Sequence, residues 1–208
     1  MKKIKALIKS LTKNRPVEQL LVDNSEVSLD QVLESGIIRE LPIIKNLVAL
    51  TKAGIGLRDY LYMKRIVRFV QNAENITPEE RDEFLKKYGS ADFSDDLLLI
   101  IEKSDTLQKA AYIGKAFKAL LKGAIELKQF KDLSHAINKA NTDNLAILDE
   151  IYYPVISRRN PSVQDDLLQA GLLNLLHYDG LMNKQGTGYL NNDLGKLFIT
   201  HCLEKPSR

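Results

Sequence analysis

The sequence predicts an all-α fold that ends in a small winged-helix-like module. Apolar residues recur at helical spacing along most of the chain, and capping residues or prolines stand where several of these segments begin. After Arg159 the pattern changes to a helix, two short strands around a glycine-rich turn, and a final helix. We therefore predict a multi-helix body over residues 1–157 and a winged-helix-like module over residues 158–208.

The composition is that of a folded protein in a reducing compartment. Hydrophobic residues make up 44% of the sequence and charged residues 27%, as is usual for globular proteins. The single cysteine, Cys202, excludes an intramolecular disulfide and a metal site built from several cysteines. We expect a cytoplasmic protein.

Lysines interrupt the two segments that could otherwise suggest export or membrane insertion. Lys5, Lys9 and Lys13 break up the apolar region that a signal peptide needs. Lys45 and Lys52 divide the most hydrophobic stretch, so the chain lacks a run of about 18 uncharged apolar residues for a transmembrane helix. A peripheral position on the inner membrane face stays open.

Charge is distributed in blocks. The net charge of +3 falls short of the basic bias expected of a protein that wraps nucleic acid. Residues 1–15 carry six Lys or Arg and no acid, residues 41–71 carry six basic residues against Asp59, and residues 72–105 carry ten acids against four bases. These blocks either pair with one another inside the fold or offer basic faces to an anionic surface.

Three helices are predicted before residue 72. Residues 2–13 form a short basic amphipathic helix. Ser28 offers an N-cap to a second helix over Asp30–Glu40. Pro42 suits the first turn of a third helix, which we place over residues 41–71.

Two glycines, Gly54 and Gly56, lie inside the third helix. Each costs about 1 kcal/mol relative to alanine in a helix interior. Close helix packing, a kink or a hairpin bend would each compensate, and the pair, a candidate hinge, does not choose among them. A phosphate-binding loop is excluded because the glycines follow no strand and complete neither nucleotide-binding motif.

Capping signals place the next helix. Thr77, Pro78 and Glu80 have the pattern of an N-cap, a first-turn proline and a capping box. They predict a helix over residues 78–88.

Ser94 is expected to cap a helix over residues 95–103, and Asp105 or Ser104 to cap a longer one that runs to Gln129. The longer helix has an apolar stripe made of Ala110, Ile113, Phe117, Leu120, Leu121, Ala124 and Leu127. Lysines lie mostly off the stripe, where they form either a solvated face or a binding face: Lys109, Lys115, Lys118, Lys122 and Lys128.

Two further helices complete the body. They cover residues 131–140 and 142–157, and Asp143 or Thr142 caps the second. In the C-terminal module, residues 160–162 signal the start of a helix over 163–170.

The rest of the module follows from turn and cap residues. Gly171 is a natural C-cap for the first helix. A short apolar strand, a glycine-rich turn and an aromatic strand come next, and Asn191 or Asn192 caps the final helix.

Motifs for catalysis or metal binding are not found. The histidines lie in separate predicted elements without metal-binding spacing, and Cys202 has no histidine base supplied by a motif. We interpret the acidic pairs as charges at helix N-termini. We predict binding rather than catalysis, with no cofactor and no metal. The residues concerned are His135, His177 and His201, and the pairs Asp95 with Asp96 and Asp165 with Asp166.

The stretch AGLLNLLHYDGLMNKQGTGYLNNDLGKLFITHCLE resembles the end of bacterial winged helix-turn-helix domains. The resemblance implies DNA contacts from a basic recognition helix and from cations in the wing. The helix over residues 163–170, however, contains two acids and no base. The resemblance to winged domains rests on Gly171, Leu172, Leu173, Gly186, Tyr189, Leu190, Leu194 and Gly195. The cations that could reach phosphates are Arg158, Arg159, Lys184 and Lys196.

The segments LPIIKNLVALTKAGIGLRDYLYMKRIVRFV and KAFKALLKGAIELKQFKDLSHAI resemble small bacterial and prophage-borne helical proteins of the abortive-infection alpha type. The resemblance implies a role in the conflict between bacteria and phage, and it transfers no catalytic residue.

We therefore expect a non-enzymatic interaction protein in bacteria–phage conflict. Its partner is a protein or an anionic membrane surface, and its oligomeric state stays open. The alternative is a winged-helix regulator that binds DNA. The candidate binding residues of the apolar, basic segment are Lys45, Lys52, Arg58, Lys64, Arg65 and Arg68.

Overall fold

The described part of the chain is predominantly helical and contains one two-stranded antiparallel sheet. The computed structural model describes residues 57–73, 75–88, 91–153, 160–178 and 186–203. The helices predicted over residues 2–13 and 30–40, and residues 41–56 of the third, lie outside these ranges.

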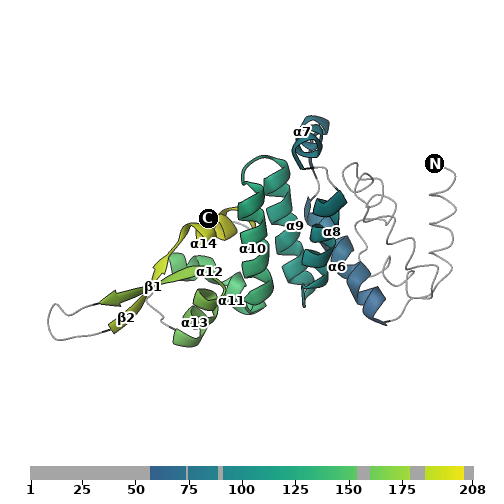
Figure 1. Cartoon of the computed structure of the whole chain (residues 1–208). Helices are drawn as coiled ribbons and strands as arrows, with labels where there is room; N and C mark the ends of the chain where they lie inside the picture. The colour runs from purple at the N-terminus through teal and green to yellow at the C-terminus, as the bar shows by residue number, and fades with distance from the viewer. Residues whose placement is uncertain (1–56, 74, 89–90, 154–159, 179–185, 204–208) are drawn as a thin grey trace, which may run out of the picture.

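Helices succeed one another until the sheet, and a last helix follows it (Figure 1). In chain order the elements are α6 (Leu57–Ala73), α7 (Pro78–Tyr88), α8 (Ala91–Glu102), α9 (Leu107–Leu121), α10 (Leu127–Lys139), α11 (Thr142–Ala146), α12 (Leu148–Tyr152), α13 (Pro161–Gln169), β1 (Leu173–Tyr178), β2 (Gly186–Asn191) and α14 (Asp193–His201).

Helix α7 forms as its capping signals predict. The Thr77 hydroxyl accepts from the Glu80 backbone N–H at 3.2 Å, and the Glu80 carboxylate accepts from the Thr77 N–H at 2.9 Å. This reciprocal pair is a capping box, which satisfies two donors that the first turn leaves free. Pro78 is the first residue of the helix.

Helix α8 begins at Ala91 and not after Ser94. The predicted N-cap is therefore wrong, and Ser94 is a buried residue inside the helix. Asp95 and Asp96 consequently lie in the second turn, so their interpretation as N-terminal charges is also wrong. Asp96 instead pairs with Lys131 of α10 at 2.7 Å.

The long helix predicted to reach Gln129 is two helices, α9 and α10. Thr106 caps α9 through its side chain, so the caps predicted at Asp105 or Ser104 are wrong by one or two residues. Gly123 has a φ of +67°, and the N–H groups of Gly123 and Ala124 bond back to the carbonyls of Leu120 and Ala119 at 3.0 and 2.9 Å. This Schellman motif ends the helix because glycine adopts the left-handed conformation without a steric cost.

Two short helices replace the single helix predicted over residues 142–157. Asn141 caps α11 by accepting from the Asp143 N–H, and α12 ends at Tyr152. The predicted caps at Asp143 or Thr142 are wrong by one or two residues. Residues 154–157 lie outside the described ranges.

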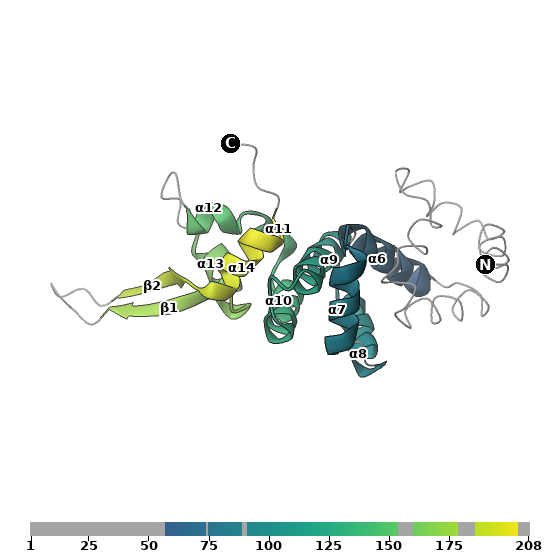
Figure 2. The same ribbon diagram turned by 90° about the horizontal axis from the view of Figure 1, so that it is seen from above.

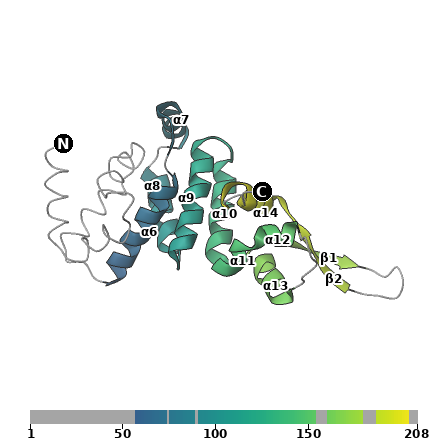
Figure 3. The ribbon, with the colours of Figure 1, turned by 180° about the vertical axis from the view of Figure 1, so that it is seen from behind.

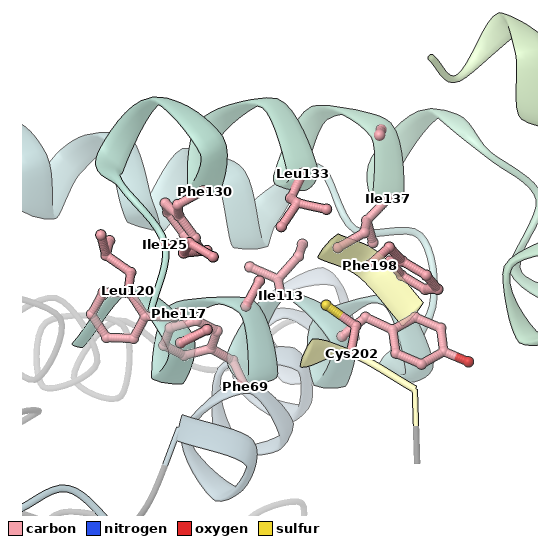
Figure 4. Packing of buried hydrophobic residues seen from close by; sticks show 14 of the residues in the cluster. Phe69, Ile113, Phe117, Leu120, Ile125, Phe130, Leu133, Ile137, Phe198 and Cys202 are labelled. Carbon is pink, nitrogen blue, oxygen red and sulfur yellow. The ribbon is translucent and has the colours of Figure 1, made fainter. Parts of the chain in front are cut away.

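Helix α9 lies at the centre of the core. It packs against α6, α10 and α14, and the ring of Phe117 contacts Phe69, Phe84 and Phe130 at centroid distances of 5.3, 5.6 and 5.7 Å. A Cβ at Gly114 would lie 2.3 Å from the Phe69 carbonyl oxygen, so this glycine allows α6 to approach closely. Figure 4 shows the rings of Phe69, Phe117 and Phe130 together with Leu133 and Ile137 of α10.

The hydrophobic core continues across the predicted boundary at residue 158. Phe198 and Cys202 from the α14 end of the chain are fully buried in the same cluster as Phe117, as Figure 4 shows. The rings of Tyr112 and Phe198 lie 5.1 Å apart in an edge-on arrangement. The division into two domains stays a prediction.

The C-terminal elements follow the predicted order of helix, strand, strand and helix. Helix α13 ends in a second Schellman motif at Gly171, which has a φ of +82°. Strands β1 and β2 pair in a continuous register from Leu173↔Asn191 to Tyr178↔Gly186. The hairpin projects away from the helices in three views (Figures 1, 2 and 3).

Candidate functional site

A basic stripe on α6 consists of Arg58, Leu61, Lys64, Arg65 and Arg68. Its four basic residues are all predicted binding residues. Arg58, Leu61, Arg65 and Arg68 recur at i, i+3, i+7 and i+10, so they share one face of the helix, and Lys64 lies beside them. Leu61 is 48% exposed, and Arg68 is exposed as well. Lys45 and Lys52 of the same prediction, and the predicted hinge glycines Gly54 and Gly56, lie outside the described residues.

Two of the stripe's arginines contact the acidic block of residues 72–105. The Arg58 guanidinium pairs with Glu102 at 2.7 Å, and the side chains are 83% and 42% exposed. A pair this exposed contributes little to stability. Arg65 donates to the Ser104 carbonyl and lies 5.8 Å from the centre of the Tyr62 ring.

The pKa of Tyr62 depends on burial and on the charges near the α6 stripe. Burial, assisted by the negative charge of Glu102 and opposed by Arg65, raises the pKa of Tyr62 to about 12. Its hydroxyl donates to the Leu98 carbonyl at 3.4 Å. The stripe is thus joined to α8 by polar contacts, and Arg58 and Arg68 are its exposed cations.

Lys109 departs from the prediction that the lysines of α9 stay off the apolar stripe. The residue is only 2% exposed. Its ammonium donates to the Asp105 carboxylate at 3.0 Å and to the Asn138 carbonyl at 3.2 Å. The spacing of Asp105 and Lys109 predicts their i,i+4 ion pair. It does not predict the burial of Lys109, which comes from packing against α10.

The C-terminal module is anchored by the buried Tyr152, which no local pattern in the sequence marks. The Tyr152 hydroxyl donates to the Leu172 carbonyl and accepts from the Asn192 N–H at 3.0 Å. Asn192 caps α14, as predicted, by accepting from the Gly195 N–H at 2.9 Å. This network joins α12, the start of β1 and the start of α14.

Gly195 makes the tyrosine contact possible. A Cβ there would lie 1.8 Å from the Tyr152 hydroxyl oxygen and 2.6 Å from the Leu172 carbonyl oxygen. The burial of Tyr152 raises its pKa, because the phenolate form loses its hydration. Burial therefore favours the neutral phenol, although the hydrogen bond from Asn192 opposes it.

The two carboxylates of α13 are built into the module. Asp165 accepts from the Tyr189 hydroxyl, which raises the pKa of Tyr189. Asp166 accepts from the Asn141 N–H and from the Asn144 side chain, both at 2.9 Å. They are not in the first turn of α13, so their interpretation as N-terminal helix charges is wrong.

The hairpin carries no charge in its strands. Neither β1 nor β2 contains Lys, Arg, Asp or Glu. Leu175 and Leu190 are 42% and 43% exposed, and the register places them on opposite faces of the sheet. The hairpin therefore presents exposed apolar side chains on both faces.

Of the four predicted phosphate contacts, Lys196 alone lies within the described residues. Lys196 lies exposed on α14 and pairs with Asp193 at 3.3 Å. Arg158, Arg159 and Lys184 lie outside the described residues, so their relation to Lys196 stays untested.

No group of three or more His, Cys, Asp or Glu that could hold a metal ion occurs among the residues that the structure describes. Cys202 is fully buried, and burial raises the pKa of its thiol to about 12 despite the opposing charge of Lys115. Burial also lowers the pKa of the adjacent His201. No helix in the described ranges has the length and hydrophobicity to cross a membrane.

Comparison with known proteins found no match among family models, curated proteins or solved structures. The two family resemblances described above stay predictions.

Proposed function

We propose that this chain is a non-enzymatic interaction protein, and that its projecting C-terminal hairpin is a docking element for a protein partner. One observation carries the proposal. The strands of the hairpin are uncharged and expose Leu175 and Leu190, while the helix before them carries carboxylates and no base.

This chemistry favours a protein over duplex DNA. A recognition helix lies among phosphates, and cations supply most of the binding free energy. Asp165 and Asp166 would meet those phosphates as like charges. An uncharged strand suits backbone pairing or apolar contact with another polypeptide.

Cys202 supports binding over catalysis. A thiolate is the nucleophilic form of cysteine, and the pKa of about 12 keeps this thiol protonated at neutral pH. Its complete burial also keeps it away from any substrate.

The resemblance to abortive-infection proteins supports bacteria–phage conflict as the setting. In this proposal the hairpin docks a partner protein, and the basic stripe of α6 offers a second surface to anionic lipid or to the same partner. Exposed Leu61 and Arg68 supply the mixture of apolar and basic groups that an interfacial helix uses.

A DNA-binding measurement tests the proposal against the regulator alternative. Fluorescence anisotropy with a labelled duplex is recorded at low and at physiological salt for the native chain and for a variant with Arg158, Arg159, Lys184 and Lys196 changed to alanine. We expect weak binding that the variant leaves unchanged. Tight binding that collapses with salt and disappears in the variant would establish the DNA-binding alternative.

A phage-plating assay tests both the role in bacteria–phage conflict and the role of the hairpin. A host expressing the chain is compared with hosts expressing the Leu175→Lys, Leu190→Lys double variant. Leu99→Lys is the matched control, because Leu99 is an exposed leucine of α8 with 54% exposure. Protection should be lost with the double variant and kept with the control. Equal protection by all three would remove the hairpin from the function.

The α6 stripe is tested separately by binding to anionic vesicles. Glutamine at Arg58, Lys64, Arg65 and Arg68 should weaken the binding while helicity is unchanged, since roughly 1 kcal/mol per basic residue is gained near anionic lipid. Unchanged vesicle binding would remove the membrane surface as a partner and leave the protein partner.

A further inference from the structure

Strand β1 lacks the features that usually protect a sheet edge. Alternate residues of an edge strand point their N–H and C=O groups outward, where another strand can pair with them. Native proteins block such edges with charged side chains, proline or bulges. The β1 sequence, LNLLHY, has no proline and no Lys, Arg, Asp or Glu, and its register with β2 is continuous.

A two-stranded hairpin is also incomplete energetically. Isolated pairs of strands are marginally stable in water, and further strands are normally needed. Helix α13 packs against β1 and Tyr189 is tied to Asp165. Leu175, however, remains 42% exposed. Another strand alongside would cover part of this apolar surface.

The β1 edge is better suited to pairing than the β2 edge. Three of the six residues of β1 are leucines, whereas β2 contains Gly186 and Gly188, and glycine weakens a strand. The end of β2 is already engaged, because the Asn191 side chain donates to the Tyr152 carbonyl at 3.2 Å. No described helix runs along the outer side of the distal half of β1 (Figure 2).

We propose that the β1 edge pairs with the β1 edge of a second copy of this chain, in antiparallel orientation about a two-fold axis, to give one sheet shared by both hairpins. This inference rests on the proposed docking role of the hairpin and names its first partner. The composition of β1 indicates the partner strand. Because β1 carries no Lys, Arg, Asp or Glu, it has no charge that would favour pairing with a charged strand. The β1 strand of a second copy is an apolar strand that is always present at equal concentration.

The geometry of a symmetric pair matches the leucines. Residues directly opposite each other in an antiparallel pair lie on the same face of the sheet. With the axis at Leu175, this leucine faces its own copy, and Asn174 faces Leu176 of the other copy. No like charges meet across the axis, so the self-pairing meets no electrostatic opposition within the strand.

The test measures molar mass by multi-angle light scattering over a range of concentrations. The native chain should be a dimer, and Leu175→Lys a monomer, since two lysines would face each other across the axis. Leu190→Lys is the matched control, because Leu190 has 43% exposure and lies on β2. It should keep the dimer, as should Leu99→Lys on α8.

A charge-swap experiment keeps the proposal falsifiable if a lysine at position 175 disturbs the fold. Leu175→Glu should also be monomeric, and an equimolar mixture of Leu175→Lys with Leu175→Glu should recover a dimer, because residue 175 faces its own copy. Circular dichroism of each variant checks that the helices are intact.

The outcomes separate this inference from the proposed function. A native chain that is monomeric throughout, or a dimer that survives Leu175→Lys, overturns the self-pairing. If protection against phage is nevertheless lost in the hairpin double variant, the docking role stands with another protein as partner. A β1-dependent dimer whose loss leaves protection unchanged supports the self-pairing and contradicts the docking role.

Discussion

Different interactions stabilise the helical body and the C-terminal module. The body comprises α6 to α10, and the module comprises α13, the hairpin and α14. In the body, aromatic rings close the core around Phe117. In the module, a hydrogen-bond network around Tyr152 fixes the elements, and the hairpin leaves leucines exposed on both faces. The difference indicates that the body is held mainly by apolar packing, whereas the module is anchored by hydrogen bonds and has an unprotected strand at its sheet edge.

The two regions nevertheless share one core. Phe198 of α14 packs against Tyr112 of α9, and both belong to the cluster that contains Phe117. We therefore expect them to unfold together, and substitutions in each region can break that expectation.

The largest effect is expected at Phe117. Phe117→Ala should lower the free energy of unfolding by about 3–5 kcal/mol, because it removes a fully buried ring and leaves a cavity. Urea unfolding followed by far-UV circular dichroism and by tyrosine fluorescence gives the measurement. Leu99→Ala at the exposed surface of α8 is the control and should change little. Separate transitions for the two signals would contradict unfolding as one unit.

A smaller loss is expected at Tyr152. Tyr152→Phe removes a hydroxyl that serves two buried backbone groups, and it should cost about 1–3 kcal/mol. Tyr153→Phe is the control, since Tyr153 is 58% exposed and adjacent in sequence. Equal effects of the two changes would contradict the anchoring role.

A double-mutant cycle with Gly195→Ala tests whether Gly195 and the Tyr152 hydroxyl are coupled. Alone, Gly195→Ala should be more damaging than Tyr152→Phe, because the added Cβ would lie 1.8 Å from the phenol oxygen. Combined with Tyr152→Phe its cost should fall, since the oxygen is gone, and urea unfolding should show less than the sum of the two changes. Strict additivity would mean that the two sites are not coupled.

The capping box of α7 should matter least among the substitutions. Thr77→Ala is expected to cost about 1 kcal/mol, because only the exposed first turn loses a hydrogen bond. Thr200→Ala, at an exposed position of α14 that caps nothing, should be neutral. A loss well above that of Tyr152→Phe would reverse the ranking of the two regions.

Alkaline titration compares Tyr62 of the body with Tyr152, the tyrosine that anchors the module. The pKa of Tyr62 is raised from 10.0 to about 12, and burial raises that of Tyr152 as well. The folded state holds these protons more tightly than the unfolded state, so their stabilisation is present below pH 10 and is lost as the pH rises towards 12. Tyr62→Phe and Tyr152→Phe should each flatten the fall in the unfolding free energy. An unchanged slope in either variant would contradict the corresponding shift.

Local signals in the sequence accounted for much of the helical structure. The caps at Thr77 and Asn192 and the C-cap at Gly171 act through hydrogen bonds within a few residues, so residue types at fixed spacing suffice to predict them. Gly123 carries the same Schellman motif as Gly171. The sequence does not reveal this motif, because the apolar stripe continues past Gly123 and predicts a single helix.

The sequence by itself thus determined the predominantly helical fold and the order of the module's elements, because periodicity and capping are local properties. The tertiary structure decided what the polar residues do. Lys109, Asp165 and Asp166 resemble solvated charges in the sequence, yet each is bound by groups brought close by folding. The exposure of Leu175 and Leu190 was likewise not predictable, because it depends on how far the hairpin extends beyond the helices. Such contacts join residues far apart in the chain, and no local pattern records them.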